Sequence, residues 1–260
     1  MSRRMLVILG ALGGGYLVLC GLLFFMQRAI LFPAPKVLDA PPPSLTRFDV
    51  PNGTFLLMHE VEGDGPVVVR FHGNGEQVAW CEGEAKFWAA QGASFVTVEY
   101  PGYPGTKGEP SERGIVDASE AALKFLTSDR KIDRSRLVLE GQSLGSGVAV
   151  QLVDRGWGAK LILLTPYTSI TEVGARAFPY FPVRLLIRDE FDSATRAPAV
   201  KIPTLVIHGT DDEVIPFEIG KKLAGLIAHA QFMEVKGGTH NDLWAYPEVK
   251  QALVGFLSQR

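Results

Sequence analysis

The sequence has 260 residues, of which 47% are hydrophobic and 21% charged, and its formal net charge is -2. This composition excludes a disordered or fibrous chain, and the small net charge gives no electrostatic reason to expect a nucleic-acid partner. The two cysteines, Cys20 and Cys81, are too few for a disulfide framework, and no Cys-x-x-Cys or histidine cluster indicates a metal site.

The first predicted element is an apolar helix near the N-terminus. No charged residue occurs from Met5 to Met26, and a helix of that length spans roughly the 30 Å hydrocarbon core of a bilayer. We interpret residues 1–28 as an uncleaved transmembrane anchor that contacts the membrane through residues 5–26. A cleaved signal peptide is the main alternative, but the apolar run is long for one and no small-x-small cleavage site follows it before Arg28.

The charges beside the apolar run bear on its orientation. Arg3 and Arg4 precede the run and favour a cytoplasmic N-terminus. We therefore expect a single-pass membrane protein whose large domain lies on the non-cytoplasmic (periplasmic or extracytoplasmic) face. Arg28 and Lys36 favour the opposite orientation, which stays open as an alternative.

Residues 29–44 are expected to form a stiff connector, because the stretch from Phe32 to Ser44, FPAPKVLDAPPPS, is rich in proline. Residues 45–260 then form one domain in which strands alternate with helices. The expected strands are short apolar runs bounded by turn residues: Thr54–Glu60, Pro66–Phe71, Ala93–Tyr100, Arg136–Glu140, Lys160–Thr165, Pro203–His208 and Gln231–Val235.

The expected helices have mixed polar and apolar faces: Gln77–Gln91, Ser111–Thr127, Gly145–Asp154, Phe217–Ala228 and Pro247–Ser258. The later strands are continuously apolar, as a parallel sheet that is buried on both faces requires. The alternation predicts an α/β fold with a doubly wound, mostly parallel sheet.

The segment of residues 167–198 interrupts this alternation. It is long for a crossover and includes RAFPYFPVRLLIRDEF, from Arg176 to Phe191. Two interpretations stay open: a small lid over the ends of the strands, where such sheets bind ligands, or a crossover helix with an irregular loop.

The stretch GQSLGSG places Ser143 between a buried strand and a helix, with Gly141 and Gly145 two positions away on either side. Such a turn exposes a serine hydroxyl above the sheet, and small flanking residues let the neighbouring backbone approach. It also directs the backbone N–H of Leu144 toward a developing oxyanion. Asn74, in HGNGE after an earlier strand, is the candidate second oxyanion donor.

A serine nucleophile requires a base and an orienting acid. Asp211 and Asp212 directly follow one predicted strand, and His240 lies in GGTHNDL after the last strand. All these positions are at the carboxyl ends of strands, so we expect them at the same edge of the sheet as Ser143, in the order nucleophile, acid, histidine. Spacing does not decide between the two aspartates. The remaining histidines are expected to have structural roles: His59, His72, His208 and His229.

The combination of HGNGE, EYPGYPGTKGEPSE, GQSLGSG, HGTDDEVIP and GGTHNDL resembles the α/β-hydrolase superfamily. It is similar above all to the small membrane-anchored members, which include protein depalmitoylases and bacterial hydrolases, and MQRAILFPAP after the apolar run fits the same group. The resemblance covers nearly the whole chain. It implies that Asp212, the fifth residue of the H-G-x-x-D pattern, is the acid of a triad with Ser143 and His240.

These features predict a serine hydrolase that cleaves esters or thioesters with apolar acyl groups through an acyl-serine intermediate, with no metal and no organic cofactor. The expected partners are a small acyl substrate, a lipid or acylated protein among them, and the membrane, with no nucleic acid. A membrane-anchored serine peptidase, a non-catalytic binding protein of the same fold and a soluble secreted esterase are the alternatives.

Overall fold

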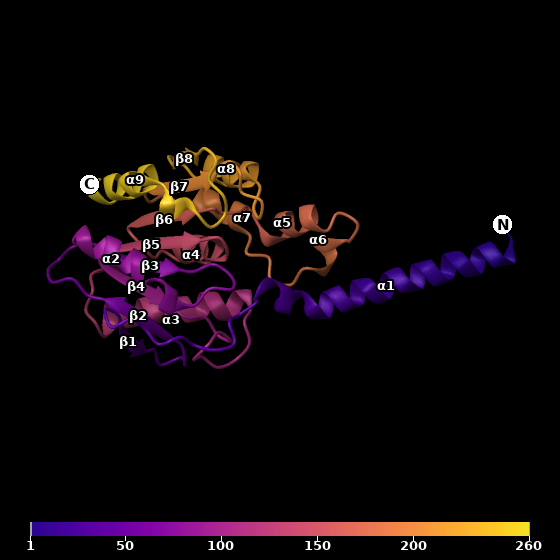
Figure 1. The fold of residues 1–260 in the computed structure, drawn as a ribbon, viewed down its shortest axis with the longest axis horizontal. Coiled ribbons are helices and arrows are strands. Elements are labelled where there is room, and N and C mark those ends of the chain that lie inside the picture. Colours follow the sequence, from indigo (N-terminus) through magenta and orange to yellow (C-terminus); the bar gives the residue numbers. More distant parts are fainter. Residues whose placement is uncertain (1, 260) are drawn as a thin grey trace.

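The computed structural model describes residues 2–259, which form a single eight-stranded sheet with helices on both faces, and a long N-terminal helix (Figure 1). The strand order is β1-β2-β4-β3-β5-β6-β7-β8, with β1 and β2 antiparallel to their neighbours and β3 to β8 parallel. The strands are β1 (Thr46–Asp49), β2 (Phe55–His59), β3 (Val67–Phe71), β4 (Ser94–Val98), β5 (Leu137–Gln142), β6 (Lys160–Leu164), β7 (Thr204–Gly209) and β8 (Gln231–Val235).

Helices cover both faces of this sheet. One face is packed against α3 (Glu112–Ser128), α4 (Leu144–Asp154) and α8 (Phe217–Leu226), and the other against α2 (Glu82–Ala90) and α9 (Pro247–Ser258). Within residues 2–259, four 3-10 helices lie between these elements: Val78–Trp80, Arg134–Arg136, Ala197–Ala199 and Leu243–Ala245. The expected doubly wound, mostly parallel α/β sheet is confirmed.

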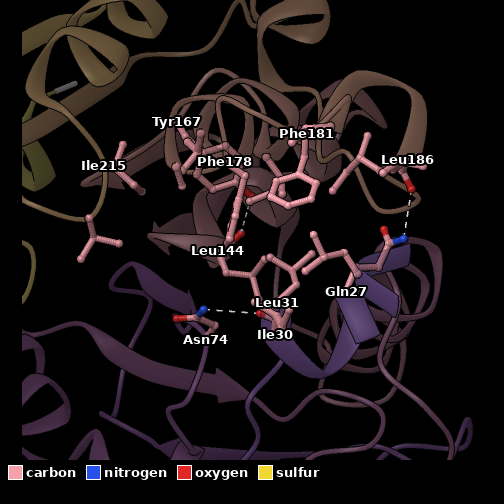
Figure 2. A pocket seen from close by; sticks show the side chains of 18 of the residues that line it. Gln27, Ile30, Leu31, Asn74, Leu144, Tyr167, Phe178, Phe181, Leu186 and Ile215 are labelled. Atoms are coloured by element: carbon pink, nitrogen blue, oxygen red, sulfur yellow. Dashed lines mark hydrogen bonds between the residues drawn. The ribbon is translucent and has the colours of Figure 1, made fainter. Parts of the chain in front are cut away.

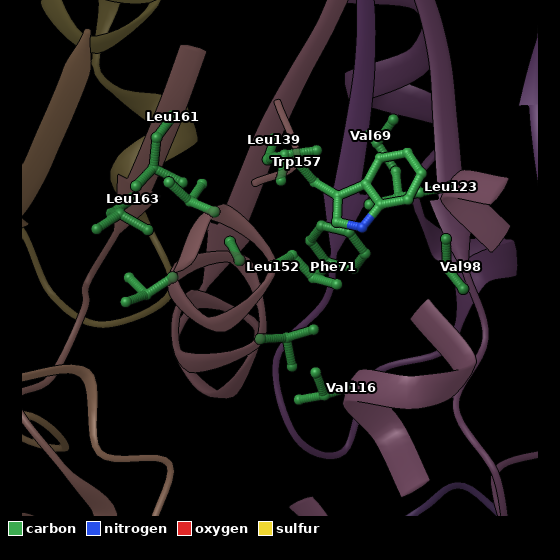
Figure 3. Close-up of a cluster of buried hydrophobic side chains, with 14 of the residues drawn as sticks. Val69, Phe71, Val98, Val116, Leu123, Leu139, Leu152, Trp157, Leu161 and Leu163 are labelled. Carbon is green, nitrogen blue, oxygen red and sulfur yellow. The ribbon is translucent and has the colours of Figure 1, made fainter. Parts of the chain in front are cut away.

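The core explains why the central strands read as continuous apolar runs. In β3, Val67, Val69 and Phe71 pack into the cluster under α3 and α4, whereas Val68 faces the cluster under α2 and α9. Figure 3 shows the first cluster, which combines strand residues such as Val69 and Phe71 with Leu152 of α4. Fully burying one such side chain contributes roughly 1.5–3 kcal/mol, so both faces of the strand stabilise the sheet.

The strand β1 was not predicted from the sequence. Its residues Thr46, Arg47, Phe48 and Asp49 are mostly exposed and have neither an apolar run nor a clean alternation. Their pairing is set by the neighbouring strand, since Phe48 lies opposite Leu56 of β2. An edge strand of this kind is held by backbone hydrogen bonds that composition does not reveal.

The N-terminal helix α1 (Arg3–Leu31) extends past residue 28, where the anchor was expected to end, and Phe32 caps it. Its most apolar 18-residue window has a mean hydropathy of 2.2, which makes α1 a candidate membrane span. It projects away from the sheet in Figure 1. Phe32 itself is buried and packs edge-on against Phe191.

The segment of residues 167–198 contains three short helices between β6 and β7: α5 (Ile170–Ala177), α6 (Val183–Leu186) and α7 (Ser193–Arg196). Helices α5 and α6 lie beside the C-terminal half of α1 in Figure 1. Several hydrogen bonds join the segments directly. Among them, Tyr16 Oη donates to the carbonyl of Tyr180, and Gln27 Nε2 donates to the carbonyl of Leu186. We call residues 167–198 the lid segment.

Candidate active site

Ser143 occupies the sharp turn between β5 and α4. Its backbone has φ 49° and ψ -118°, a conformation that L-residues rarely adopt. A Cβ on Gly145 would collide with the carbonyl oxygen of Phe71, and a Cβ on Gly141 would collide with the carbonyl oxygen of Gly145. Gly145 is therefore required by the close approach of the turn to β3, and Gly141 by the close approach of β5 to the first turn of α4, as the motif predicts.

The structure brings His240 and Asp212 to this turn. His240 Nε2 lies 2.9 Å from Ser143 Oγ, and His240 Nδ1 lies 2.8 Å from Asp212 Oδ2. An ionised carboxylate only accepts hydrogen bonds, so His240 Nδ1 carries a proton and, in the neutral ring, Nε2 is free to accept the serine proton. This tautomer is the one that base catalysis needs.

Asp212 is held in place by groups from its own loop and from β7. Its Oδ1 accepts the N–H groups of Val214 and Ile215 at 2.9 and 2.8 Å, and His208 Nε2 lies 3.1 Å from Oδ2. Burial raises the pKa of the Asp212 carboxyl, but the hydrogen bonds from His208 and His240 oppose this more strongly, so the net pKa lies below its ordinary value. Asp212 is thus an anion at neutral pH.

Asp211, the other aspartate that the sequence left open, is exposed and points elsewhere. Its Oδ1 accepts a hydrogen bond from the hydroxyl of Thr210, and its backbone N–H donates to the carbonyl of Gly238. Of the two aspartates, Asp212 is the one whose carboxylate lies within hydrogen-bond distance of His240.

The two candidate oxyanion donors both border Ser143. Leu144 is the first residue of α4, and the first N–H groups of a helix have no partner within the helix. Asn74 lies in the loop after β3, whose Gly73 is so close that a Cβ there would lie 3.6 Å from the Cβ of Ser143. Asn74 also contacts α1, since its Nδ2 donates to the carbonyl of Leu31 at 3.4 Å.

An apolar cavity of about 250 Å3 opens beside Ser143 (Figure 2). Three parts of the chain line it: the C-terminal end of α1, the lid segment, and the loops that carry Asn74 and Ile215. Its residues are Leu23, Gln27, Ile30, Leu31, Asn74, Ser143, Leu144, Tyr167, Ile170, Val173, Gly174, Ala177, Phe178, Phe181, Val183, Leu186, Ile187, Val214 and Ile215. An apolar cavity with one polar corner suits an acyl chain whose carbonyl reaches Ser143.

No protein-family model matches the chain. An uncharacterized protein of Mycobacterium tuberculosis (strain H37Rv) is 34% identical over 191 residues, which are 73% of this chain and 68% of that protein. The alpha/beta hydrolase domain-containing protein aho-3 of Caenorhabditis elegans is 35% identical over 160 residues, 61% of this chain and 47% of the relative. This chain belongs to the α/β-hydrolase superfamily.

Further matches to this hydrolase are consistent with that membership. The lysophosphatidylserine lipase ABHD12 of Danio rerio is 30% identical to this chain. The match covers 74% of this chain and 58% of the lipase, so this chain spans less than two thirds of that relative. The solved esterase Pf2001 of Pyrococcus furiosus has a TM-score of 0.70 at 16% identity, covering 86% of this chain and 97% of the esterase. The esterase EaEST of Exiguobacterium antarcticum has a TM-score of 0.63 at 19% identity, covering 82% and 99%.

The structure of this hydrolase adds two features that sequence reasoning missed. His208 bonds within its turn, as expected, since its Nε2 lies 2.9 Å from the carbonyl oxygen of Ile215. Its additional contact with Asp212 was not foreseen, and its position four residues before that aspartate was the available signal. The contribution of α1 to the cavity had no signal in the sequence, because Leu23 and Ile30 lie far along the chain from the lid segment.

A second buried pair supports the loop that carries Asn74. His72 Nε2 lies 3.1 Å from Glu99 Oε1, and Tyr100 Oη donates to the carbonyl of His72 at 2.9 Å. His72 thus shapes this loop, as expected, and makes no contact with Ser143 among the described hydrogen bonds.

Proposed function

We propose that this chain is a membrane-anchored serine esterase in which Ser143, His240 and Asp212 form a catalytic triad. The observation that carries the proposal is the continuous chain of hydrogen bonds from Ser143 Oγ through His240 to the Asp212 carboxylate, beside an apolar cavity. The substrate class is a carboxylic ester or thioester with an apolar acyl group. The esterase and lipase names of similar proteins support hydrolysis of an ester bond.

The proposed reaction follows from which atoms carry protons. His240 Nε2 takes the proton of Ser143 Oγ as the oxygen attacks the acyl carbonyl, and the same nitrogen returns the proton to the departing alcohol or thiol. The ionised Asp212 stabilises the positive charge that then develops on the ring. A water activated by His240 hydrolyses the acyl-serine in a second, equivalent step.

The carbonyl oxygen gains negative charge in both steps, and the N–H groups of Leu144 and Asn74 are the proposed donors to it. Removing one such donor typically costs about 10²–10³ in kcat. Leu144 adds the partial positive charge of the α4 N-terminus to this site.

We also propose that α1 spans the membrane through residues 5–26 and that the hydrolase domain, residues 45–260, lies on the non-cytoplasmic face. The absence of charge from Met5 to Met26 and the position of Arg3 and Arg4 support this orientation. The lid segment, residues 167–198, then lies on the membrane side of the domain because it packs on α1.

The decisive experiment is labelling of the full chain with a fluorophosphonate probe, which reacts with a serine that a base and an oxyanion site activate. Wild type should be labelled, and Ser143→Ala should lose labelling together with about 10⁶-fold of its ester hydrolysis. Ser146→Ala is the matched control, since Ser146 is the next serine in the same stretch and its hydroxyl only donates to the carbonyl of Ser143.

Other outcomes separate the alternatives. Labelling of wild type without hydrolysis of any ester or thioester would favour a peptidase. A folded wild type that is not labelled would contradict an assembled triad and favour a non-catalytic binding protein.

A further inference from the structure

The lid segment is attached to the middle of the candidate membrane span, well before its end. Tyr16 donates its hydroxyl to the carbonyl of Tyr180 at 2.8 Å, and its ring stacks on Phe181 with 5.8 Å between centroids. Tyr16 lies inside the uncharged run from Met5 to Met26. At ~1.5 Å of rise per residue, Tyr16 is roughly 15 Å along the helix from Met26, and the depth along the bilayer normal is smaller for a tilted helix. The lid segment thus lies beside a part of α1 that is apolar.

The part of the lid segment nearest Tyr16 exposes large apolar side chains. We call residues 178–186 the lid tip. Tyr180 is 85% exposed and Leu185 is 84% exposed, and Phe178 is exposed beside them. A patch of neighbouring exposed apolar side chains usually indicates a surface that binds another protein or a membrane.

Basic residues surround the lid tip. Arg176, Arg184 and Arg188 are all exposed, and Arg188 lies over the ring of Phe24 on α1. Apolar side chains flanked by arginine are typical of segments that insert into the boundary between lipid headgroups and acyl chains. The chemistry of this surface therefore fits a bilayer, whose anionic or zwitterionic headgroups would meet the guanidinium groups.

The cavity beside Ser143 also extends along α1. On α1, Leu23, Gln27 and Leu31 follow one another at four-residue spacing, and all three line the cavity that also contains Ser143. Figure 2 shows Gln27 and Leu31 on the α1 side of the cavity, opposite Phe181 of the lid tip. Leu31 lies roughly 8 Å beyond Met26 along the helix, at ~1.5 Å per residue. An ester carbonyl at Ser143 would therefore lie at headgroup depth, with its acyl chain directed along α1 into the hydrocarbon.

The cavity is modest in volume. At about 250 Å3 it is smaller than the roughly 300–1,000 Å3 of sites that enclose a drug-sized ligand. The rest of a long acyl chain would extend past Leu23, into the space that the bilayer fills around α1.

We propose that the lid tip inserts into the leaflet next to the hydrolase domain and that acyl lipids pass sideways from this leaflet, between α1 and the lid segment, to Ser143. This inference rests on the proposed function, since it needs α1 in the membrane and an acyl ester as substrate. In this arrangement the acyl chain never crosses water, and α1 is a wall of the substrate site as well as an anchor.

The depth of the lid tip is tested with the full chain in vesicles of phosphatidylcholine and phosphatidylglycerol. Both native cysteines are buried, and burial raises the pKa of the Cys81 thiol to about 12, so a cysteine at an exposed position is labelled selectively. Leu185→Cys carries an environment-sensitive fluorophore, and Val37→Cys, a 72% exposed position in the connector, is the control.

The label at residue 185 should emit at shorter wavelengths than the label at residue 37 and should be quenched by lipids that carry a nitroxide on the acyl chain. Equal emission at both positions, with no quenching, would overturn the proposal. A shift that depends on protein density and ignores the lipid quencher would also overturn it, because a second copy of the chain would then cover the lid tip.

Substrate entry is tested by comparing a long-chain fluorogenic ester dissolved in the vesicles with a short water-soluble ester. Leu185→Asp should lower the ratio of the two rates by about tenfold or more, the effect of losing one buried leucine, while Val37→Asp should leave the ratio unchanged. An unchanged ratio in Leu185→Asp would overturn the proposed route. If wild type hydrolyses neither ester, the proposed function fails, and the fluorescence experiment still decides the depth of the lid tip.

Discussion

At the scale of single residues, Asp212 shows how one carboxylate is kept ionised in a buried place. Its two oxygens receive hydrogen bonds from two backbone N–H groups and from two histidines, His208 and His240. These contacts stabilise the charged form more than burial destabilises it, which lowers the pKa of the carboxyl. The same contacts therefore make the folded state depend on pH.

We expect Asp212 to stabilise the fold at neutral pH and to lose that effect in acid. Because its pKa is lower in the folded than in the unfolded chain, the unfolded chain binds more protons as the pH falls below about 3.9, the ordinary aspartate value. The stabilisation is complete above that pH and disappears as the pH approaches the lowered folded value. Thermal unfolding of wild type and Asp212→Asn should differ most at pH 6–7, with the difference shrinking below about pH 4.

Asp211→Asn is the control for this measurement, since the Asp211 side chain is exposed and accepts its hydrogen bond from the neighbouring Thr210. Its melting temperature should follow wild type at every pH. A constant difference between wild type and Asp212→Asn over the whole range would mean that Asp212 contributes by shape and hydrogen bonding, without its charge.

At the scale of elements, one buried aspartate of the lid segment joins it to two helices of the molecule, α1 and α3. The Asp189 carboxylate accepts hydrogen bonds from Arg28 of α1, from Nε at 2.7 Å and from Nη2 at 3.1 Å. It also accepts a hydrogen bond from the backbone N–H of Glu112 in α3 at 2.9 Å. The bidentate geometry is the strongest arrangement of an arginine and a carboxylate. It fixes the lid segment beside the end of α1, where the cavity wall lies.

Replacing Arg28 with methionine should loosen the lid segment while the sheet stays folded. The change leaves the Asp189 carboxylate buried with one backbone donor, at a cost of about 1–3 kcal/mol. Trypsin cleavage after Arg184 and Arg188, both exposed in the lid segment, should become faster in Arg28→Met. The double variant Arg28→Met/Asp189→Asn should be cleaved more slowly than Arg28→Met, because the amide carries no charge to leave unpaired.

Arg113→Met is the matched control for lid cleavage. Arg113 also pairs with an aspartate, Asp117, but its side chain is 92% exposed and the pair contributes little. Equal cleavage of Arg28→Met and Arg113→Met would show that the Arg28 pair does not hold the lid segment.

The elements differ in how well the sequence predicts them, for physical reasons. The central strands were predicted to within a few residues, because burial on both faces imposes continuous apolar runs such as those of β3 and β6. The edge strand β1 was missed, since backbone pairing alone defines it. The interaction of α1 with the lid segment was also missed, because it joins residues such as Tyr16 and Tyr180 that no local pattern relates.

The candidate site shows the same division. The positions of Ser143 and His240 at strand ends followed from the alternation of strands and helices, whereas the spacing of residues left Asp211 and Asp212 equivalent. Their backbone positions separate them: Asp212 is buried under His208, and Asp211 faces the solvent.

At the scale of the whole molecule, a buried polar network lies on the α2 side of the sheet and joins the strands that carry the candidate site. Arg70 of β3 donates from Nη1 to Glu140 Oε1 at 3.0 Å and from Nη2 to Gln142 Oε1 at 2.8 Å, both in β5. Glu140 also accepts Trp88 Nε1 of α2 at 3.2 Å. Gln142 directly precedes Ser143, so this network supports the strand end from which the serine turn starts.

The buried Glu140 carboxylate makes the network sensitive to the loss of the Arg70 guanidinium. Burial raises the pKa of the Glu140 carboxyl, and Arg70 is the main group that opposes this. Removing one partner of a buried ion pair typically costs about 3–5 kcal/mol, whereas removing both charges costs much less. The network therefore depends on its charges being matched.

Arg70→Met should lower the free energy of unfolding by about 3–5 kcal/mol at neutral pH, and the second change Glu140→Gln should restore most of it. The glutamine keeps an acceptor for Trp88 and removes the charge of the fully buried carboxylate. Glu76 and Glu84, which also lie near Arg70 Nη2, are partly exposed to solvent. In the folded Arg70→Met variant, the pKa of Glu140 is raised above its unfolded value of about 4.3. The variant therefore keeps its stability below about pH 4.3 and loses stability as the pH rises through the pKa of Glu140 in the folded state. Urea unfolding at pH 4.5 and pH 7.5 measures both effects, and additive losses in the double variant, or a deficit that does not grow with pH, would contradict a charge-matched network.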